Sequence, residues 1–196
     1  MNWRRSDFLP PRLLRGPHVQ SVLSSSPLRA IRARRRLHAI EASHEAMVLD
    51  VGNGIRLQGV HSMRPGTEPR GLVVLLHGWE GSVDSNYMRL TAARLLDGGF
   101  AVFRLNFRDH GDSHHLNEGI FHSNRIDEVV DAVRAIAARW PTRPLFAAGY
   151  SLGGNFALRL ALRAHSHGLP LQRVAAVCPV LDPARTMQQM EDGLPI

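Results

Sequence analysis

The sequence contains no lysine and a single cysteine. All 24 basic side chains among the 196 residues are arginines, and they exceed the acidic side chains by seven. Net positive charge attracts polyanions, but an arginine-only excess is typical of GC-rich coding bias and does not by itself indicate a binding surface. Cys178 cannot form an internal disulfide, and its place in the apolar run 174–180 predicts a small buried side chain in a reducing compartment.

Long apolar runs are also missing. No window approaches the roughly 18 apolar residues of a membrane-spanning helix. Asp7, Pro10 and Pro11 interrupt the stretch in which a signal peptide would need continuous apolar residues. The sequence therefore predicts a soluble, cytoplasmic protein with no transmembrane segment, and we expect neither a metal nor a cofactor.

The positive charge is concentrated near the N-terminus, where nine of the arginines lie in the first 36 residues. Residues 1–45 mix these arginines with serines and four prolines, which indicates an irregular basic lead-in with a short helix around 28–38. We expect a solvated arm whose attraction to polyanions is weak and screened by salt. Two alternatives stay open, in which the arm binds nucleic acid or an anionic membrane surface.

Residues 46–196 show the alternation of strands and helices that is typical of an α/β domain. Asn-Gly within 52–54, between alternating apolar runs at 47–51 and 55–60, predicts an antiparallel hairpin. The later predicted strands are 72–76, 100–107, 145–149 and 174–180, and the predicted helices are 86–96, 126–140 and 155–164. Such units predict right-handed crossovers and a mostly parallel, doubly wound sheet.

A nucleophile elbow is predicted at residues 149–153, which read Gly-Tyr-Ser-Leu-Gly. The motif G-x-S-x-G falls between a predicted strand and a predicted helix, where the tight turn exposes the serine at the carboxyl edge of the sheet. Glycines two residues before and after the serine allow the backbone to pass closely. This context favours Ser151 as a nucleophile over a serine that lies in a glycine-rich turn by chance.

An oxyanion-hole loop is predicted at residues 77–81, directly after the strand 72–76. A tetrahedral intermediate of acyl transfer needs two backbone N–H donors, for which we select Trp79 and Leu152, the residue after the nucleophile. His77 is a candidate general base, but a histidine immediately before this glycine is interpreted as a brace for the loop.

A further cluster of polar residues follows the strand 100–107. His110, Asp109 and Ser113 invite a reading as a local triad, but triad partners usually come from separate loops. We interpret 108–113 as a structural turn, with three surface histidines after it, namely His114, His115 and His122. Asp182 is a candidate acid, although Pro183 after it favours a helix N-cap.

The chain resembles the α/β-hydrolase superfamily, and within it the AB-hydrolase family four of carboxylesterases and lipases. The segments that carry the resemblance are 8–11 with 16–21, 77–82, 106–108 and 149–155. The resemblance implies hydrolysis of a small-molecule or lipid ester by a Ser-Asp-His triad, with Ser151 as the nucleophile.

The acid and the base of the triad are not identified in this chain. The resemblance implies that both follow later strands, whereas the chain ends at Ile196, so we expect an α/β-hydrolase fold that is incomplete at the C-terminus and an inactive isolated chain. A truncated gene product, a fragment and half of a split protein all stay open, as does a non-catalytic binding module. The strand 174–180 would then be an open apolar edge through which the chain could self-associate.

Overall fold

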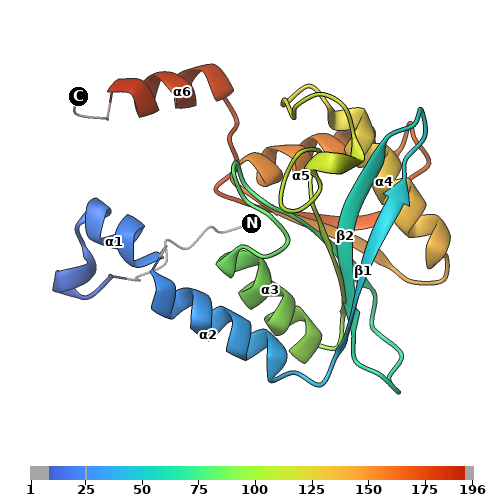
Figure 1. Cartoon of the computed structure of the whole chain (residues 1–196), viewed down its shortest axis with the longest axis horizontal. Coiled ribbons are helices and arrows are strands. Elements are labelled where there is room, and N and C mark those ends of the chain that lie inside the picture. Colours follow the sequence, from blue (N-terminus) through green and yellow to red (C-terminus); the bar gives the residue numbers. More distant parts are fainter. Residues whose placement is uncertain (1–8, 25, 193–196) are drawn as a thin grey trace, which may run out of the picture.

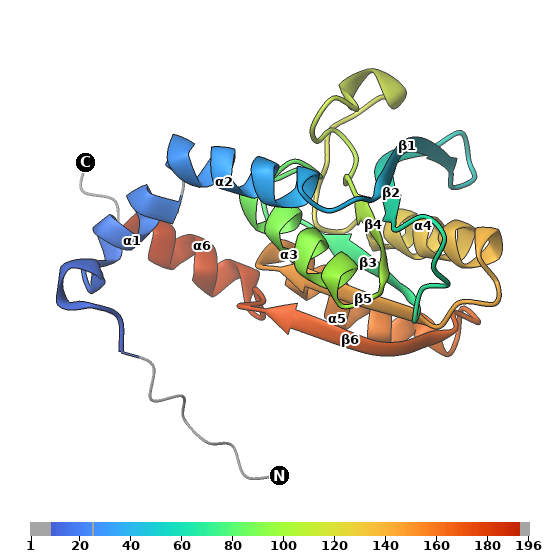
Figure 2. The ribbon, with the colours of Figure 1, turned by 90° about the horizontal axis from the view of Figure 1, so that it is seen from below.

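The computed structural model describes residues 9–24 and 26–192, which form a six-stranded sheet with helices on both faces (Figures 1 and 2). The strands are β1 (Ser43–Asp50), β2 (Arg56–Met63), β3 (Leu72–Leu76), β4 (Ala101–Leu105), β5 (Leu145–Tyr150) and β6 (Leu171–Val177). The helices are η1 (Arg12–Leu14), α1 (Pro17–Ser24), α2 (Pro27–His38), α3 (Asn86–Asp97), η2 (His114–Leu116), α4 (Ile126–Arg139), α5 (Leu152–Ala164) and α6 (Pro183–Asp192). None of the helices in these ranges has the length and apolar character that crossing a bilayer requires.

The strand order is β1-β2-β4-β3-β5-β6. Strand β2 runs antiparallel to both of its neighbours, while β4, β3, β5 and β6 pair in parallel. The predicted hairpin is confirmed, because Gly52, Asn53 and Gly54 all adopt positive φ between β1 and β2. The mostly parallel, doubly wound sheet is therefore confirmed as well.

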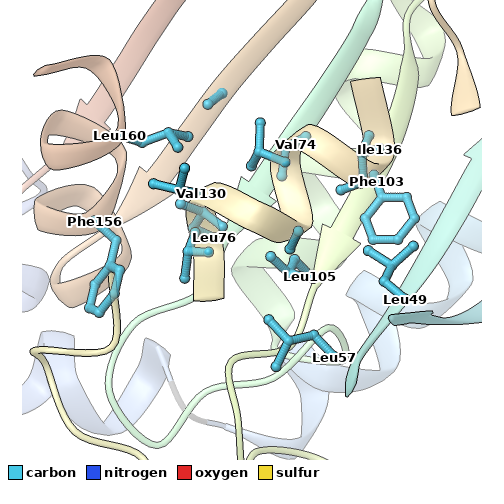
Figure 3. Close-up of a cluster of buried hydrophobic side chains, with 14 of the residues drawn as sticks. Leu49, Leu57, Val74, Leu76, Phe103, Leu105, Val130, Ile136, Phe156 and Leu160 are labelled. Carbon is cyan, nitrogen blue, oxygen red and sulfur yellow. The ribbon is translucent and has the colours of Figure 1, made fainter. Parts of the chain in front are cut away.

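The central strand β3 is buried on both faces, as its continuous apolar run predicts. Leu72, Val74 and Leu76 face α4 and α5, whereas Val73 and Leu75 face α3 on the other side. Figure 3 shows the larger of these two cores, in which Val130 and Ile136 of α4 and Phe156 and Leu160 of α5 cover the sheet. Because β3 pairs in parallel with β5, with Leu76 opposite Gly149, the carboxyl ends of these two strands lie next to each other.

The segment before the sheet is partly built into the domain. Helix α2 packs against α3, and Ala33, Leu37 and Ile40 are buried there. The predicted short helix at 28–38 is thus confirmed. Strand β1 begins at Ser43, four residues before the predicted start of the first apolar run.

Strand β6 lies at the edge of the sheet and ends earlier than predicted. It spans Leu171–Val177 because Cys178 takes a positive φ of 47° and Pro179, which lacks an N–H, follows. The prediction of a buried Cys178 is wrong, since the thiol is exposed. Cys178 follows Val177, the last paired residue of β6, and in the described part of the chain no further strand lies beside β6 to cover it.

The unpaired edge of β6 is expected to cause self-association of the 196-residue chain. Its exposed backbone groups can pair with a second copy, and a charged side chain on an edge opposes such pairing. Ala175→Lys on β6 should shift the chain toward monomer in multi-angle light scattering. Val48→Lys on β1, the opposite edge, is the matched control and should leave the association unchanged. A monomeric parent chain with a cooperative melt would contradict the prediction.

Candidate active site

Ser151 occupies a strained turn between β5 and α5. Its backbone has φ 52° and ψ −115°. Residues other than glycine rarely adopt such backbone angles, and those that do are found most often at functional sites. The surrounding structure holds it there, since the Ser151 N–H donates to the Val177 carbonyl at 2.9 Å and the Asn155 N–H donates to the Ser151 carbonyl at 3.1 Å. The strand-turn-helix context of the predicted elbow is therefore present.

The two glycines of the motif are required by close backbone contacts. A Cβ at Gly153 would lie 2.3 Å from the His77 carbonyl oxygen, and a Cβ at Gly149 would lie 2.1 Å from the Gly153 carbonyl oxygen. Neither distance is compatible with a side chain. The elbow is thus pressed against the end of β3, and this contact brings the loop after β3 next to the nucleophile.

The loop after β3 lies against this turn. The Gly78 N–H donates to the Tyr87 hydroxyl at 2.9 Å, and a Cβ at Gly78 would lie 3.4 Å from the Ser151 Cβ. Within residues 9–24 and 26–192, the N–H groups of Trp79 and Leu152 have no acceptor. Leu152 opens α5, so its amide also carries the partial positive charge of a helix N-terminus. These two amides have the free donors that an oxyanion hole needs.

His77 braces the loop and is not available as a base. Its Nδ1 donates to the Gly78 carbonyl at 2.7 Å, and its Nε2 accepts from the Phe107 N–H at 3.1 Å. Burial lowers the pKa of His77 to about 4, with a smaller opposing effect from the Gly78 carbonyl. Both ring nitrogens are therefore occupied in the neutral form, and the interpretation of His77 as a brace is confirmed.

Strand β4 holds the far end of the same loop through contacts that the sequence analysis missed. Arg104 donates from a guanidinium nitrogen to the Val83 carbonyl at 2.6 Å, and the Asn106 side-chain oxygen accepts from the Val83 N–H at 2.8 Å. Burial lowers the pKa of Arg104 to about 10, and Asp84 opposes that shift. The segment 106–108 carries the family resemblance, but no sequence signal connects it to Val83, which lies 23 residues earlier than Asn106.

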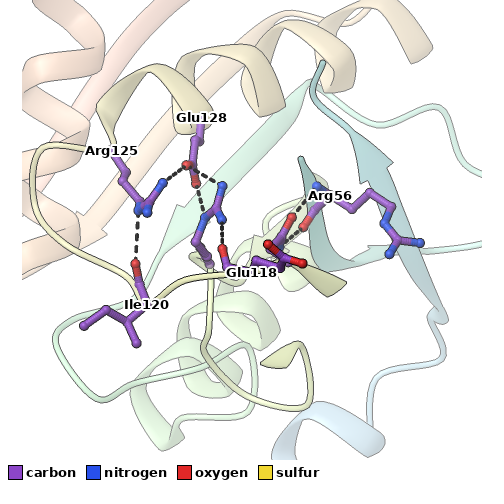
Figure 4. A network of polar contacts seen from close by, with 7 residues as sticks. Arg56, Glu118, Ile120, Arg125 and Glu128 are labelled. Atoms are coloured by element: carbon purple, nitrogen blue, oxygen red, sulfur yellow. Dashed lines mark hydrogen bonds and ion pairs between the residues drawn. The ribbon is translucent and has the colours of Figure 1, made fainter. Parts of the chain in front are cut away.

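Residues 108–113 form a structural turn, as predicted. The Ser113 hydroxyl donates to the His110 carbonyl at 2.7 Å, and His110 Nδ1 lies 2.8 Å from the Arg108 carbonyl. Arg108 makes a paired contact with Glu128 of α4, with N–O distances of 3.1 and 2.8 Å, and Arg125 joins the same carboxylate (Figure 4). The Arg108–Glu128 pair fixes the turn on α4. His110 and Ser113 contact backbone carbonyls, and Asp109 contacts His114, so His110, Asp109 and Ser113 do not form a triad.

A cleft of about 290 Å³ opens beside the elbow and is mostly apolar. Its walls are formed by Trp79, Phe121, His122, Ser123, Ser151, Leu152, Val180, Pro183, Thr186, Met187 and Met190. The cleft thus brings together all three residues predicted for the site. His114, His115 and His122 are exposed as predicted, and His122 also lies in this wall, which no pattern in the sequence indicated.

Helix α6 supplies one wall of the cleft with a single face. Pro183, Thr186, Met187 and Met190 recur at helical spacing, and this period is a signal by which the wall could have been found in the sequence. Asp182 accepts from the Arg185 N–H at 3.0 Å and so caps α6. The predicted N-cap role of Asp182 is confirmed.

Two buried histidines are expected to make the stability of the fold fall in acid. Burial lowers the pKa of His61 to about 4, as it does for His77, and the cations Arg143 and Arg139 add to the shift at His61. An unfolded histidine titrates near 6.5, so the unfolded chain binds more protons between about pH 6.5 and 4. The stabilisation is therefore complete above pH 6.5 and is lost as the pH falls toward 4, by about 1.4 kcal/mol for each pKa unit.

The replacement His61→Phe tests this pH dependence. His61 stacks on Trp140 with a centroid distance of 4.2 Å, and its Nε2 has no hydrogen-bond partner in the described structure. Phenylalanine keeps the stacking and does not titrate. Thermal melts should show unchanged or higher stability at pH 7 and a shallower loss toward pH 4.5. A parallel loss in the parent and the variant would contradict the assignment.

The fold is that of the α/β hydrolases, with the elbow after β5 and the free amides beside it. A family model described as "Serine aminopeptidase, S33" matches residues 67–194. The chain belongs to this family of α/β hydrolases. A comparison with curated proteins finds no match.

Several solved structures share the fold. Esterase Est22 superposes with a TM-score of 0.66 at 18% identity, covering 87% of this chain and 54% of that one. The esterase Pf2001 of Pyrococcus furiosus gives 0.65 at 20% identity over 80% and 58%. XC6422 of Xanthomonas campestris, described as an α/β serine hydrolase without lid, gives 0.59 at 23% identity over 72% and 63%. The chain thus spans little more than half the length of the two esterases.

Proposed function

We propose that the protein hydrolyses carboxylic esters through an acyl-enzyme on Ser151. The observation that carries the proposal is the strained Ser151 turn beside the two free amides of Trp79 and Leu152. Strained backbone conformations are found most often at active sites, where the surrounding structure maintains them. Two neighbouring N–H groups without an acceptor can donate hydrogen bonds to a developing oxyanion. The apolar cleft fits the acyl or alcohol part of an ester.

In the proposed mechanism, Ser151 Oγ loses its proton to a base and attacks the ester carbonyl carbon. The carbonyl oxygen becomes an oxyanion that accepts hydrogen bonds from the Trp79 and Leu152 amides. Collapse of the intermediate expels the alcohol, which takes the proton, and leaves an ester of Ser151. Water then attacks the carbonyl carbon of this ester while the base takes a proton from water. The bond from the acyl carbon to Ser151 Oγ breaks, the base returns the proton to Oγ, and the carboxylic acid leaves.

The base of this mechanism is not in place among the residues that the structure describes. No histidine nitrogen in these ranges is hydrogen-bonded to Ser151 Oγ. His77 is fully engaged, and His110 contacts the Arg108 carbonyl. We therefore propose that the 196-residue chain alone acylates slowly, supported by the oxyanion amides only.

A second candidate function is amide hydrolysis, which the description of the family as serine aminopeptidases favours. Amides need protonation of a poorer leaving group, so they depend more strongly on a general acid. The two functions are separated by incubating the chain with p-nitrophenyl butyrate and with alanine p-nitroanilide, followed by peptide mass spectrometry. Ester hydrolysis predicts a butyryl adduct on the Ser151 peptide and no aminoacyl adduct. An alanyl adduct without a butyryl adduct would favour the aminopeptidase.

A further inference from the structure

The outward face of α2 carries apolar side chains that the fold does not use. Ala33 and Leu37 form the inner face against α3, while Leu28 and Ile31 on the outer face are 79% and 47% exposed. The preceding residues continue this pattern, since Leu13 and Val22 are 89% and 70% exposed. Single exposed apolar side chains are common on protein surfaces, whereas a group of them on one segment indicates an interaction surface.

Arginines surround these apolar groups, and most of them have no acidic partner. Arg29, Arg32 and Arg35 are exposed on α2, and shallow hollows on its surface place Leu28 and Ile31 beside these guanidinium groups. In the described structure, Arg36 is the α2 arginine with an ion pair, which it makes with Asp97. The sequence has no acidic residue between Asp7 and Glu41. The surface therefore combines uncompensated positive charge with apolar area.

One end of this surface lies at the end of the molecule toward which the parallel strands point. In Figure 2, β3, β5 and β6 point toward the end of the molecule from which α1 and α6 project, and Figure 1 shows both helices at that same end. Ser151 follows β5 at this carboxyl edge. Helix α1 thus projects from the same end of the molecule as α6, which supplies one wall of the cleft.

We propose that η1, α1 and α2 form a docking surface for an anionic phospholipid bilayer. Guanidinium groups bind lipid phosphates at the headgroup level, while Leu13, Val22, Leu28 and Ile31 enter the acyl boundary. This is the arrangement of a helix that lies in the plane of an interface, with basic and apolar side chains on the side that meets the lipid. The proposal stands on this surface and does not depend on the reaction at Ser151.

Nucleic acid fits the same surface less well. Its phosphates would satisfy the arginines but would leave the apolar side chains in water. Residues 9–40 contain no phenylalanine, tyrosine or tryptophan on which unpaired bases could stack. The combination of charge with aliphatic side chains therefore favours lipid.

Vesicle flotation of the full 196-residue chain tests the proposal. The chain should float with vesicles of phosphatidylcholine and phosphatidylglycerol at 3:1 and remain at the bottom with pure phosphatidylcholine. Replacement of Arg29, Arg32 and Arg35 by glutamine should lower the partition coefficient about 10²-fold, since each arginine near an anionic surface contributes about fivefold. Leu28→Ser with Ile31→Ser should lower it about tenfold or more.

Matched controls remove the same number of charges and the same kinds of apolar side chain elsewhere. Arg134, Arg139 and Arg163 on α4 and α5 are replaced by glutamine, and exposed Ile120 and Leu162 by serine. These variants should float like the parent, and circular dichroism melts establish that every variant is folded. Equal flotation with both kinds of vesicle, or equal loss in the matched variants, would overturn the proposal. Gel shifts that showed a tight complex with nucleic acid at physiological salt, without flotation, would overturn it as well.

Discussion

Replacing Ser151 with alanine is expected to abolish ester turnover, with the largest effect of any single substitution in this chain. The full effect requires a protein in which an acid and a histidine base are present. We would fuse this chain to the C-terminal segment of a structurally similar esterase, because the chain spans 54% of esterase Est22. In such a fusion, kcat for p-nitrophenyl butyrate should fall by about 10⁴ to 10⁶, as in other serine hydrolases that lose their nucleophile.

Ser123→Ala is the matched control for this experiment. Ser123 lines the same cleft and also carries a hydroxyl, but it lies in the loop before α4 instead of the strained elbow. Its replacement should leave kcat nearly unchanged, because its hydroxyl takes no part in the proposed bond changes at the ester carbonyl. If Ser151→Ala kept its turnover and Ser123→Ala lost it, the assignment of Ser151 as the nucleophile would be wrong.

The chain tested alone should turn over the same ester about 10⁴-fold more slowly than the active fusion. A serine hydroxyl is a weak nucleophile until an adjacent base accepts its proton. The amides of Trp79 and Leu152 remain, so a residual rate of roughly 10³-fold over water is expected from oxyanion stabilisation and binding. Stopped-flow and steady-state assays of p-nitrophenol release from the chain and the fusion measure this ratio.

Two histidine variants of the isolated chain provide the control. His122 lies in the cleft wall, and His110 lies in the buried turn after β4. His122→Ala and His110→Ala should both leave the slow rate unchanged. Fast, Ser151-dependent turnover by the isolated chain that either variant abolished would identify that histidine as the base. A folded fusion that turned over no ester would instead favour a non-catalytic binding module.

Much of the fold could be predicted because its elements have strong local patterns. The strand 72–76 and the starts of α3 and α4 agree with the structure residue for residue. Each combines an unbroken apolar run or a helical period with a turn signal beside it. The last strand was predicted at 174–180, three residues later than β6. The apolar run does not reveal that Cys178 adopts a positive φ and ends the pairing.

The candidate site could be predicted in part. The glycine spacing around Ser151 carries its own physical requirement, so the elbow could be placed from 149–153 together with the predicted strand before it and the predicted helix after it. The surroundings could not be predicted in the same way. His122 and Ser123 reach the cleft from the loop before α4, and their neighbours in the sequence carry no motif that connects them to Ser151.

By itself the sequence determined the order of strands and helices, the hairpin at 52–54, the elbow and the role of Asp182 as a helix cap. These features depend on interactions within about ten residues, where periodicity and turn chemistry act directly. Only the tertiary structure decided that His77 accepts from the Phe107 N–H, and that Arg104 and Asn106 hold Val83. Such contacts depend on which strands lie side by side and in which register, and that choice is made by burial of the whole sheet between two layers of helices.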